Sequence, residues 1–305
     1  MKEDIKNLAA SVHQRLLNKA RETNRPFNEL LQYYAIERFL YRLSRSPFED
    51  RFVLKGALMF NAWGVTGFRT THDIDLLGHT SNVVEQIVDL FRQVCIVNVE
   101  PDGWVFDVES VQGERIKEDA EYEGVRVTFI GWLGRTRAYM QIDIGFGDIV
   151  APDPIDVNYP VILDFPFPVL HGYPRETLIA EKFQAMVALG EINSRLKDFY
   201  DICTLAMTFD FDGEVLQQAI EQTFKQRGTS LPTDIPVALT ERFVVRKTLY
   251  WDAFINRSGL KQPYYDFENA IWILQKFLMP PVHASVTGQK FVETWEKGRQ
   301  WTAIK

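Results

Sequence analysis

The stretch that decides the fold is GFRTTHDIDLLG, residues 67–78. In it, Asp73 and Asp75 alternate with the apolar Ile74 and Leu76, which is the period of a β-strand with one buried face. Residues i and i+2 of a strand project from the same face, so the two carboxylates lie within about 7 Å of each other. Two ionised carboxylates that close raise each other's pKa unless something positive lies between them.

A divalent cation answers this repulsion directly. Mg²⁺ takes one or two carboxylates in proteins and keeps its other positions for water and phosphate oxygens. An isolated D-x-D pattern is short, however, and is also met where one aspartate caps a helix while the other faces solvent. The surrounding sequence has to decide between a metal site and this structural alternative.

Upstream of the strand, Lys55-Gly56-Ala57 falls within FVLKGALMFNAWG, whose apolar spacing over 52–64 predicts a helix that ends at a glycine. Small residues at a helix start let backbone N–H groups approach an anion, and the helix terminus favours negative charge. The same Gly-Ala pair is also compatible with simple close packing, so the block by itself predicts an anion site only weakly.

Downstream, RAYMQIDIGFGD predicts another strand, in which Gln141 and Asp143 share a polar face opposite Ile142 and Ile144. Asp143 joins the first two aspartates if the two strands are neighbours. A solvent-exposed strand aspartate is the alternative. Asp148, just beyond Gly147, is the rival candidate for the third carboxylate.

Length and composition describe an ordinary globular chain. Its 305 residues suffice for two compact lobes, and 46% hydrophobic with 25% charged residues excludes wholesale disorder. The net charge of −7 excludes a broadly basic surface, so nucleic acid would have to be bound through a local patch. Cys95 and Cys203 lie in apolar runs and are expected to be buried free thiols. The chain has no signal-peptide pattern and no membrane-spanning run, so we expect a soluble cytoplasmic protein.

The order of patterns predicts an α+β protein with a small mixed β-sheet preceded by helices and followed by a helical lobe. Helical spacing covers 3–21, 28–44 and 84–96, strand spacing covers 104–146, and helical spacing returns after 174. The segment 150–174 holds six prolines and is expected to be irregular. We therefore predict a lobe of residues 1–165 and a helical lobe of residues 166–305.

Four blocks together resemble the AbiEii/AbiGii toxin family of the nucleotidyltransferase superfamily: LKGALMF with GFRTTHDIDLL, QIDIGFGD, PRETLIAEKFQAM and RLKDFYDI. The resemblance spans roughly 35–275 and lies in the order and spacing of the blocks. The family pattern places small residues after a lysine, here Gly56 and Ala57, and then Arg-x-Ser/Thr-x-Asp-x-Asp. The pattern's last four positions are Arg69, Thr71, Asp73 and Asp75. Ala57 departs from the glycine that the family has there, so only backbone contacts to phosphate are expected from this block.

The resemblance implies a polymerase-β-like catalytic core. Asp73, Asp75 and Asp143 would hold Mg²⁺ or Mn²⁺ at the triphosphate of a bound NTP, and Asp143 would also position or deprotonate the acceptor hydroxyl. In such enzymes the acceptor hydroxyl attacks phosphorus in line with the departing pyrophosphate. Two metal ions stabilise the attacking and leaving oxygens of this displacement. Lys55, Gly56, Ala57, Arg69 and Thr71 would contact the nucleotide.

The helical lobe is expected to contribute two more residues. Lys182 matches the essential lysine of the family's A-E-K block and would neutralise charge on the leaving pyrophosphate. A solvated lysine paired with a nearby acid is the alternative. Asp198 and Asp201 lie three apart on one helix face, with Asp198 the stronger functional candidate. An Asp198–Lys182 ion pair that orients the lysine is compatible with both readings.

We therefore expect an NTP-dependent nucleotidyltransferase that releases pyrophosphate. The resemblance implies the toxin of a toxin–antitoxin, abortive-infection system, with an antitoxin protein as partner. It also implies an RNA acceptor, of which the tRNA 3′ end is our first choice because similar enzymes act there. A metal-dependent phosphodiesterase and a non-catalytic binding module that retained the fold are the alternatives. Residues 280–305 carry no functional signal.

Overall fold

The structure is a computed structural model that describes residues 2–65, 67, 69–117, 123–258, 260 and 266–303. The chain forms two compact units. The first unit comprises residues 1–66, 70–147 and 155–172, and the second comprises 67–69, 148–154 and 173–305. The two units interleave in sequence because the chain passes between them more than once. The division into domains 1–165 and 166–305 stays a prediction.

Seven strands of the first unit form one mixed sheet in the order β3-β4-β5-β2-β1-β7-β6. β2 is parallel to β5 and β1 is parallel to β7, whereas the other neighbours are antiparallel. The strands are β1 Phe52–Lys55, β2 Asp73–Gly78, β3 Trp104–Lys117, β4 Glu123–Leu133, β5 Thr136–Phe146, β6 Ile155–Asn158 and β7 Val169–Gly172. The predicted strand period over 104–146 is thus confirmed as an antiparallel meander, with Gly134 and Arg135 connecting β4 to β5.

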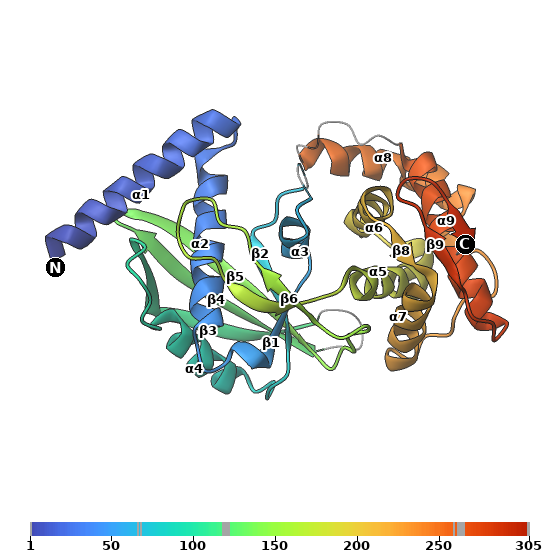
Figure 1. The fold of residues 1–305 in the computed structure, drawn as a ribbon, viewed down its shortest axis with the longest axis horizontal. Helices are drawn as coiled ribbons and strands as arrows, with labels where there is room; N and C mark the ends of the chain where they lie inside the picture. The colour runs from blue at the N-terminus through green and yellow to red at the C-terminus, as the bar shows by residue number, and fades with distance from the viewer. Residues whose placement is uncertain are drawn as a thin grey trace. The chain divides into compact units, whose positions relative to one another are not determined.

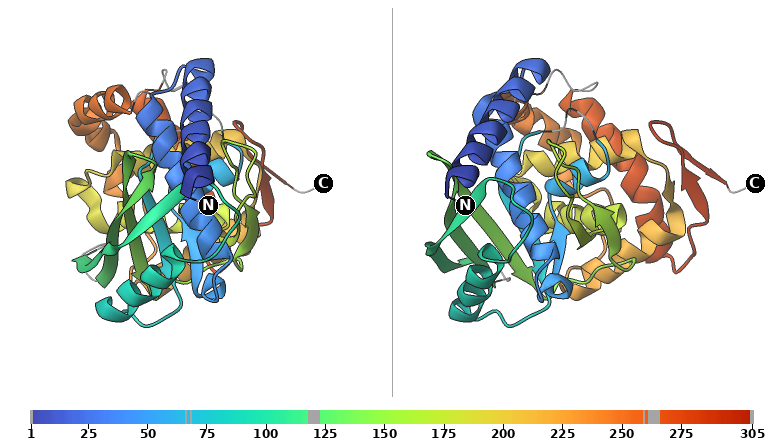
Figure 2. Two further views of the ribbon diagram at one scale, coloured as in Figure 1. Left: turned by 90° about the vertical axis from the view of Figure 1, so that its left-hand side faces the viewer. Right: turned by 60° about the vertical axis from the view of Figure 1, so that its left-hand side comes forward.

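Three helices share a core with one face of this sheet: α1 Lys2–Thr23, α2 Phe27–Ser44 and α4 Val84–Cys95. Ile74 and Leu76 of β2 and Ile142 and Ile144 of β5 all point into that core and are fully buried. Figure 1 shows α2 running across the sheet, and the turned views of Figure 2 show the same layer from other sides. Because side chains alternate along a strand, the opposite face of β2 and β5 is left to the polar residues.

Two sequence predictions for the first unit are wrong in part. Residues 52–64 were expected to form one helix, but 52–55 are strand β1, and only Leu58–Ala62 form the short helix α3. A short apolar run does not distinguish a buried strand from a helix by its period, and β1 is covered on both faces. The proline-rich segment 150–174 was expected to be irregular but contributes the four-residue strands β6 and β7, because its six prolines all lie outside these two strands.

The second unit is mainly helical, which confirms the predicted α+β class with a sheet-bearing part and a helical part. Its longer helices are α5 Arg175–Leu189, α6 Leu196–Thr208, α7 Gly213–Gln226, α8 Glu241–Arg257 and α9 Phe267–Val286. Strands β8 Phe211–Asp212, β9 Glu293–Trp295 and β10 Trp301–Ala303 form a small sheet. Short 3-10 turns are η1 Glu49–Arg51 in the first unit, with η2 Gly190–Ile192 and η3 Val237–Leu239 in the second.

Residues 280–303 complete α9 and form the β9–β10 hairpin, so their role here is structural. Trp295 is buried in this hairpin, and its indole N–H donates to the Ala206 carbonyl of α6. Cys95 and Cys203 are buried free thiols, as expected. In the described part of the chain, every helix is either too short or too polar to cross a bilayer.

Candidate active site

The three predicted metal-binding aspartates lie on the same face of the central sheet. β2 and β5 are parallel neighbours, and Asp75 is directly opposite Asp143, while Asp73 is opposite Gln141. All three aspartates are half-buried, in contrast to the buried isoleucines that alternate with them. The structure therefore places the first two carboxylates and Asp143 on one face of two neighbouring strands, and their joint binding of a metal ion stays a prediction.

The register extends this arrangement to the two flanking strands. Lys55 at the end of β1 is opposite Asp75, and Arg126 of β4 is opposite Asp143. Side chains directly opposite one another on neighbouring strands project from the same face. We call Lys55, Asp75, Asp143 and Arg126, together with Asp73, the aspartate row.

Asp143 is bound by Arg126 through two parallel hydrogen bonds. The Arg126 Nε donates to Asp143 Oδ1 and its Nη2 donates to Oδ2, each at 2.8 Å. The side chain of Arg126 is 33% exposed and that of Asp143 is 15% exposed. The hydrogen bond to Asp143 raises the pKa of Arg126 above its ordinary value, with the nearby charges of Asp73 and Glu114 acting in the same direction. Arg126 is a site residue that the sequence reasoning did not identify.

Gly56 permits the close approach of the chain to Asp75. Its φ is +73°, in the region that favours glycine, and a Cβ at this position would lie 2.0 Å from Asp75 Oδ2. Ala57 follows it at the N-terminal boundary of α3, which is only five residues long. Gly56 therefore has a steric reason to be glycine, namely the space that Asp75 occupies, and the predicted anion contact of this block stays a prediction.

Helix α2 fixes the start of β2. The side-chain amide of Gln32 donates to the carbonyls of His72, at 3.3 Å, and Tyr139, at 2.9 Å, and so ties β2 to β5. The Thr71 N–H donates to the Tyr33 hydroxyl at 3.2 Å. The backbone immediately before Asp73 is thereby held by side chains from one helix.

The donor set of the aspartate row fits a hard divalent cation. Carboxylate oxygens are the ligands that Mg²⁺ prefers, and Asp73 and Asp75 supply them from one strand face. Among the described residues, however, no group of three Asp, Glu, His or Cys side chains converges closely enough to hold a metal ion. Both oxygens of Asp143 accept hydrogen bonds from Arg126, so in this structure the third carboxylate is paired with a guanidinium.

The remaining predicted residues meet in the second unit, in a cluster that we call the buried ion network. It consists of Arg69, Lys182, Arg195, Asp198 and Asp201. The Lys182 ammonium of α5 binds the carboxylate of Asp198 and lies 2.9 Å from Asp201 Oδ2. Arg69 donates from Nε and Nη2 to the two oxygens of Asp201 at 2.9 and 2.8 Å. Arg195 Nε lies 2.8 Å from Asp198 Oδ2.

The network keeps its charges although it is buried. Burial by itself would raise the pKa of Asp201, but the Arg69 guanidinium and the Lys182 ammonium hold it at about 2. Burial would likewise lower the pKa of Lys182, and the carboxylates of Asp198 and Asp201 outweigh that effect and raise it. Lys182 is therefore a permanent cation, and the predicted Asp198–Lys182 ion pair is confirmed.

Two points of the sequence reasoning change with the structure. Asp148, the rival for the third carboxylate, lies in the second unit and binds Arg227 Nη2 at 2.8 Å, so it does not share the face of the aspartate row. Asp201, ranked below Asp198, binds two cations of the network.

Arg126 could have been identified as a site candidate from the sequence GVRVTF. There it alternates with Val125 and Val127, which places one charge on the polar face of an otherwise apolar strand.

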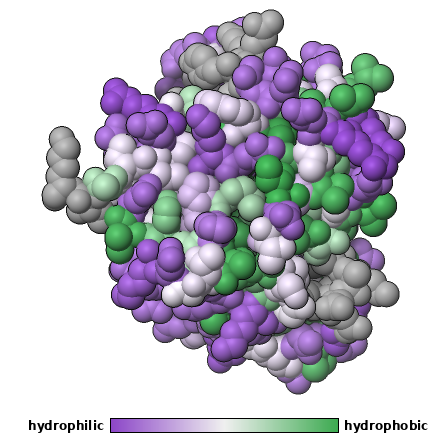
Figure 3. Space-filling model, turned by 90° about the vertical axis from the view of Figure 1, so that its right-hand side faces the viewer, coloured by the Kyte–Doolittle hydropathy of each residue, from purple (hydrophilic) through white to green (hydrophobic). Residues whose placement is uncertain are grey.

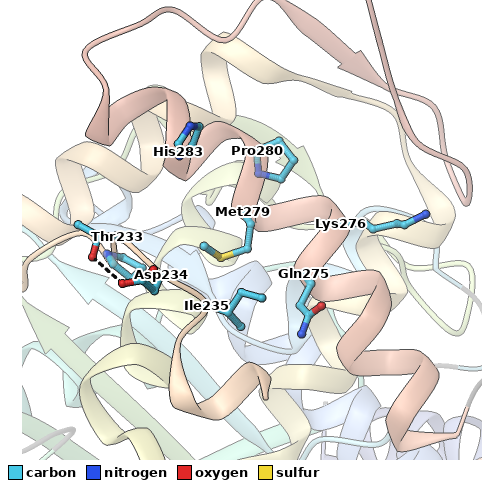
Figure 4. A pocket seen from close by; sticks show the side chains of 9 residues that line it. Thr233, Asp234, Ile235, Gln275, Lys276, Met279, Pro280 and His283 are labelled. Atoms are coloured by element: carbon cyan, nitrogen blue, oxygen red, sulfur yellow. Dashed lines mark hydrogen bonds between the residues drawn. The ribbon is translucent and has the colours of Figure 1, made fainter. Parts of the chain in front are cut away.

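A pocket of about 530 Å³ in the second unit contains none of the predicted site residues. Figure 4 shows that its side chains come from α9 and from the loop before η3, with Lys276 extending away from the others. On the face drawn in Figure 3, hydrophobic side chains form small groups separated by hydrophilic ones. Neither feature competes with the aspartate row as the place of chemistry.

Comparison with known proteins gives one family and two structures. Residues 38–271 match the family described as nucleotidyl transferase AbiEii toxin, type IV TA system. A crystal structure of JHP933 from Helicobacter pylori is 14% identical with a TM-score of 0.46, covering 82% of this chain and 90% of that one. A crystal structure of a proposed nucleotidyltransferase from H. pylori is 15% identical with a TM-score of 0.45. The match covers 82% of this chain and 93% of that one. No curated protein matches the chain.

Proposed function

Because the chain belongs to the AbiEii family of nucleotidyltransferase toxins of type IV toxin–antitoxin systems, we propose that it transfers a nucleoside monophosphate from an NTP to RNA and releases pyrophosphate. The first acceptor candidate is the 3′ end of tRNA, in the cytoplasm. The observation that carries the proposal is the register of Asp75 opposite Asp143 on parallel strands, with Asp73 on the same face. A family of this type implies an NTP substrate and an antitoxin partner.

In this proposal Asp73 and Asp75 would hold Mg²⁺ or Mn²⁺, and Asp143 would complete the set of ligands. The ion, when bound, would neutralise charge on the triphosphate and orient it for in-line attack. Asp143 positions the acceptor hydroxyl and accepts its proton. The backbone around Gly56 and Ala57 lies next to Asp75 and is proposed, with Lys55 and Thr71, to contact the nucleotide.

Lys182 is the proposed cation for the leaving pyrophosphate. A role of this kind requires a lysine that stays protonated, and the two carboxylates of the network ensure that. Asp198 is then a positioning residue, because its bond to the ammonium fixes the direction of the Lys182 side chain. The Nε and Nη2 of Arg69 bind Asp201, so we propose that Arg69 orients the network as well as serving the nucleotide.

The test is to incubate the purified protein with each labelled NTP, Mg²⁺ and total RNA, and then to sequence the RNA 3′ ends. We expect one or more nucleotides added to a defined class of RNA, which identifies acceptor and nucleotide together. Absence of label transfer to any RNA or protein, with all four nucleotides and with Mn²⁺ in place of Mg²⁺, contradicts the proposal. RNA cleavage that needs metal but no nucleotide would support the phosphodiesterase alternative instead.

Growth of cells that express the chain gives an independent readout. We expect expression to stop growth and Lys182→Met to relieve the arrest. The exposed surface lysine Lys197, on the neighbouring helix, is a matched control, because Lys197→Met removes the same charge outside the network. Growth arrest that is equal for all three proteins would favour the non-catalytic alternative.

A further inference from the structure

We propose that Arg126 is an exchangeable counter-ion of the aspartate row. It binds Asp143 in the metal-free protein and moves to Glu114 when a divalent cation takes up the Asp143 carboxylate. This inference rests on the proposed function, because it concerns the metal ion that the proposed reaction uses. It goes beyond that function by naming the residue that controls when the third aspartate becomes available.

The register places Arg126 between two carboxylates. Arg126 of β4 is directly opposite Asp143 on β5 and directly opposite Glu114 on β3. Side chains that are opposite each other on neighbouring strands have Cβ atoms about 4.5–5.5 Å apart and share a face. The long guanidinium side chain therefore has one acidic neighbour on each side and can exchange them by rotating its own side chain, without movement of β4.

The observed position of Arg126 competes with a metal ion. A guanidinium that donates to both oxygens of Asp143 uses two of the roughly four lone-pair positions of that carboxylate and fixes its orientation. It also places a positive charge beside the aspartates, which repels an incoming cation. A cation that binds Asp143 therefore competes with the guanidinium, and a guanidinium that leaves Asp143 needs another acid.

Exposure permits this exchange. The Arg126 side chain is one-third exposed and Glu114 is exposed, so neither becomes a buried unpaired charge when the partner changes. The same unit holds a contrasting pair, Arg42–Asp102, in which the arginine also binds both carboxylate oxygens. There both side chains are buried, and the arginine donates in addition to the Trp104 carbonyl. Arg42 is buried with a third hydrogen bond, whereas Arg126 is one-third exposed and has a second acid, Glu114, directly opposite it.

The experiment measures Mn²⁺ binding directly, by calorimetry and by the electron paramagnetic resonance of free Mn²⁺, with no nucleotide present. We expect Arg126→Gln to bind Mn²⁺ about tenfold more tightly than the wild type, because a charge-assisted bond no longer competes. Arg126→Lys keeps the charge but cannot make the two parallel hydrogen bonds to Asp143. Its affinity for Mn²⁺ should therefore lie between those of the wild type and Arg126→Gln. Arg137→Gln removes an exposed arginine from the same face of β5, six positions before Asp143, and should leave the affinity unchanged.

A second arm isolates the role of Glu114. Glu114→Gln removes the receiving carboxylate and should weaken Mn²⁺ binding by about threefold in the wild type, a change of about 0.6 kcal/mol. In the Arg126→Gln background the same substitution should have no effect, because no guanidinium remains to be received. If Glu114→Gln weakened Mn²⁺ binding equally in both backgrounds, Glu114 would act only through its charge at a distance. That result would overturn the exchange.

The outcomes separate this inference from the proposed function. Mn²⁺ binding that Asp73→Asn abolishes, but that Arg126→Gln does not tighten, leaves the metal site intact and refutes the exchange alone. Absence of Mn²⁺ binding in both the wild type and Arg126→Gln refutes the exchange and the metal requirement together. Melting temperatures of all variants, measured without metal, verify that each is folded when its affinity is determined.

Discussion

The aspartate row and the buried ion network use the same residue types in opposite ways. In the row, the carboxylates of Asp73, Asp75 and Asp143 outnumber the cations Lys55 and Arg126, and the face is partly open to solvent. In the network, three cations surround Asp198 and Asp201, whose side chains are 1% and 0% exposed. The row contains more carboxylates than cations among its five named members, whereas the network contains more cations than carboxylates.

This difference separates a half-buried, carboxylate-rich face from a buried cluster in which each carboxylate already binds two cations. An open face with excess carboxylate has room and charge for an additional cation. A buried carboxylate that already binds two cations has neither the room nor the charge to bind another. Its removal would leave those cations unpaired in an interior that does not solvate them. We therefore expect substitutions of the row's aspartates to lower activity with little effect on stability, whereas substitutions in the network should lower stability as well as the activity that depends on Lys182.

The largest expected effect is that of Asp201→Asn. It leaves the Arg69 guanidinium and part of the Lys182 charge uncompensated in a buried place, which should lower the free energy of unfolding by about 3–5 kcal/mol. Urea unfolding followed by far-ultraviolet circular dichroism measures this change. A loss below about 1 kcal/mol would mean that the network contributes no more than a surface ion pair.

Next is Asp73→Asn, which should reduce nucleotide transfer more than about a hundredfold, since even residues that merely support metal ligands cost up to that much. Its effect on the free energy of unfolding should be within about 0.5 kcal/mol, because it relieves repulsion in the row. Asp89→Asn, at an exposed position on α4, is the control for transfer. An unfolded Asp73→Asn protein would contradict the expectation that the aspartate row, unlike the buried ion network, contributes little to stability.

Gly56→Ala should lower transfer by between about tenfold and a hundredfold. The new Cβ would occupy the position of Asp75 Oδ2, and the φ of +73° is strained for alanine, so Asp75 must move. Gly64→Ala is the matched control, because Gly64 also has a positive φ but has no atom within 4 Å of an added Cβ. Equal activities of the two variants would show that strain alone, and not the displacement of Asp75, matters.

Acid should weaken the network specifically. The pKa of Asp201 is about 2 in the folded protein against an ordinary value of 3.8, so its contribution is complete above about pH 4 and is lost as the pH falls from about 4 to 2. The contribution at stake is about 2 kcal/mol. We expect the difference in unfolding free energy between the wild type and Asp201→Asn to narrow by about that amount between pH 5 and pH 2. A difference that is constant with pH would contradict the lowered pKa.

The smallest expected effect is that of Arg195→Ala, below about 1 kcal/mol in the free energy of unfolding. The Arg195 side chain is 35% exposed, and Lys182 remains as a partner for Asp198, so solvent and the lysine replace what is lost. Thermal melting is sensitive enough to measure it beside Arg69→Ala, which should cost more because Arg69 is largely buried. Equal costs for the two arginines would show that burial does not rank members of the network.

The strand positions of the site were readable from local pattern. A period of two places Asp73, Asp75 and Asp143 opposite apolar residues whatever the neighbouring strands are, because alternation is a property of each strand by itself. The same is true of the helices, whose apolar spacing predicted α2, α4, α5 and α6. The pattern failed at 52–55, because a strand covered on both faces has no alternation to show.

The ion-pair partners of residues on neighbouring strands and helices could not be predicted from the sequence. Nothing in GVRVTF states which acid lies opposite Arg126, because the pairing of β4 with β5 depends on their register and not on either strand alone. Arg69 and Asp201 are 132 residues apart in sequence, and no local signal connects them. Their contact exists only because the segment around Arg69 belongs to the second unit.

The sequence by itself therefore determined the face on which each acidic side chain lies, since that follows from backbone geometry over a few residues. Only the tertiary structure decided which carboxylates are buried among cations and which lie on a half-buried strand face. That distinction depends on burial and on distances between segments far apart in the chain, and electrostatic energies are set by those two quantities.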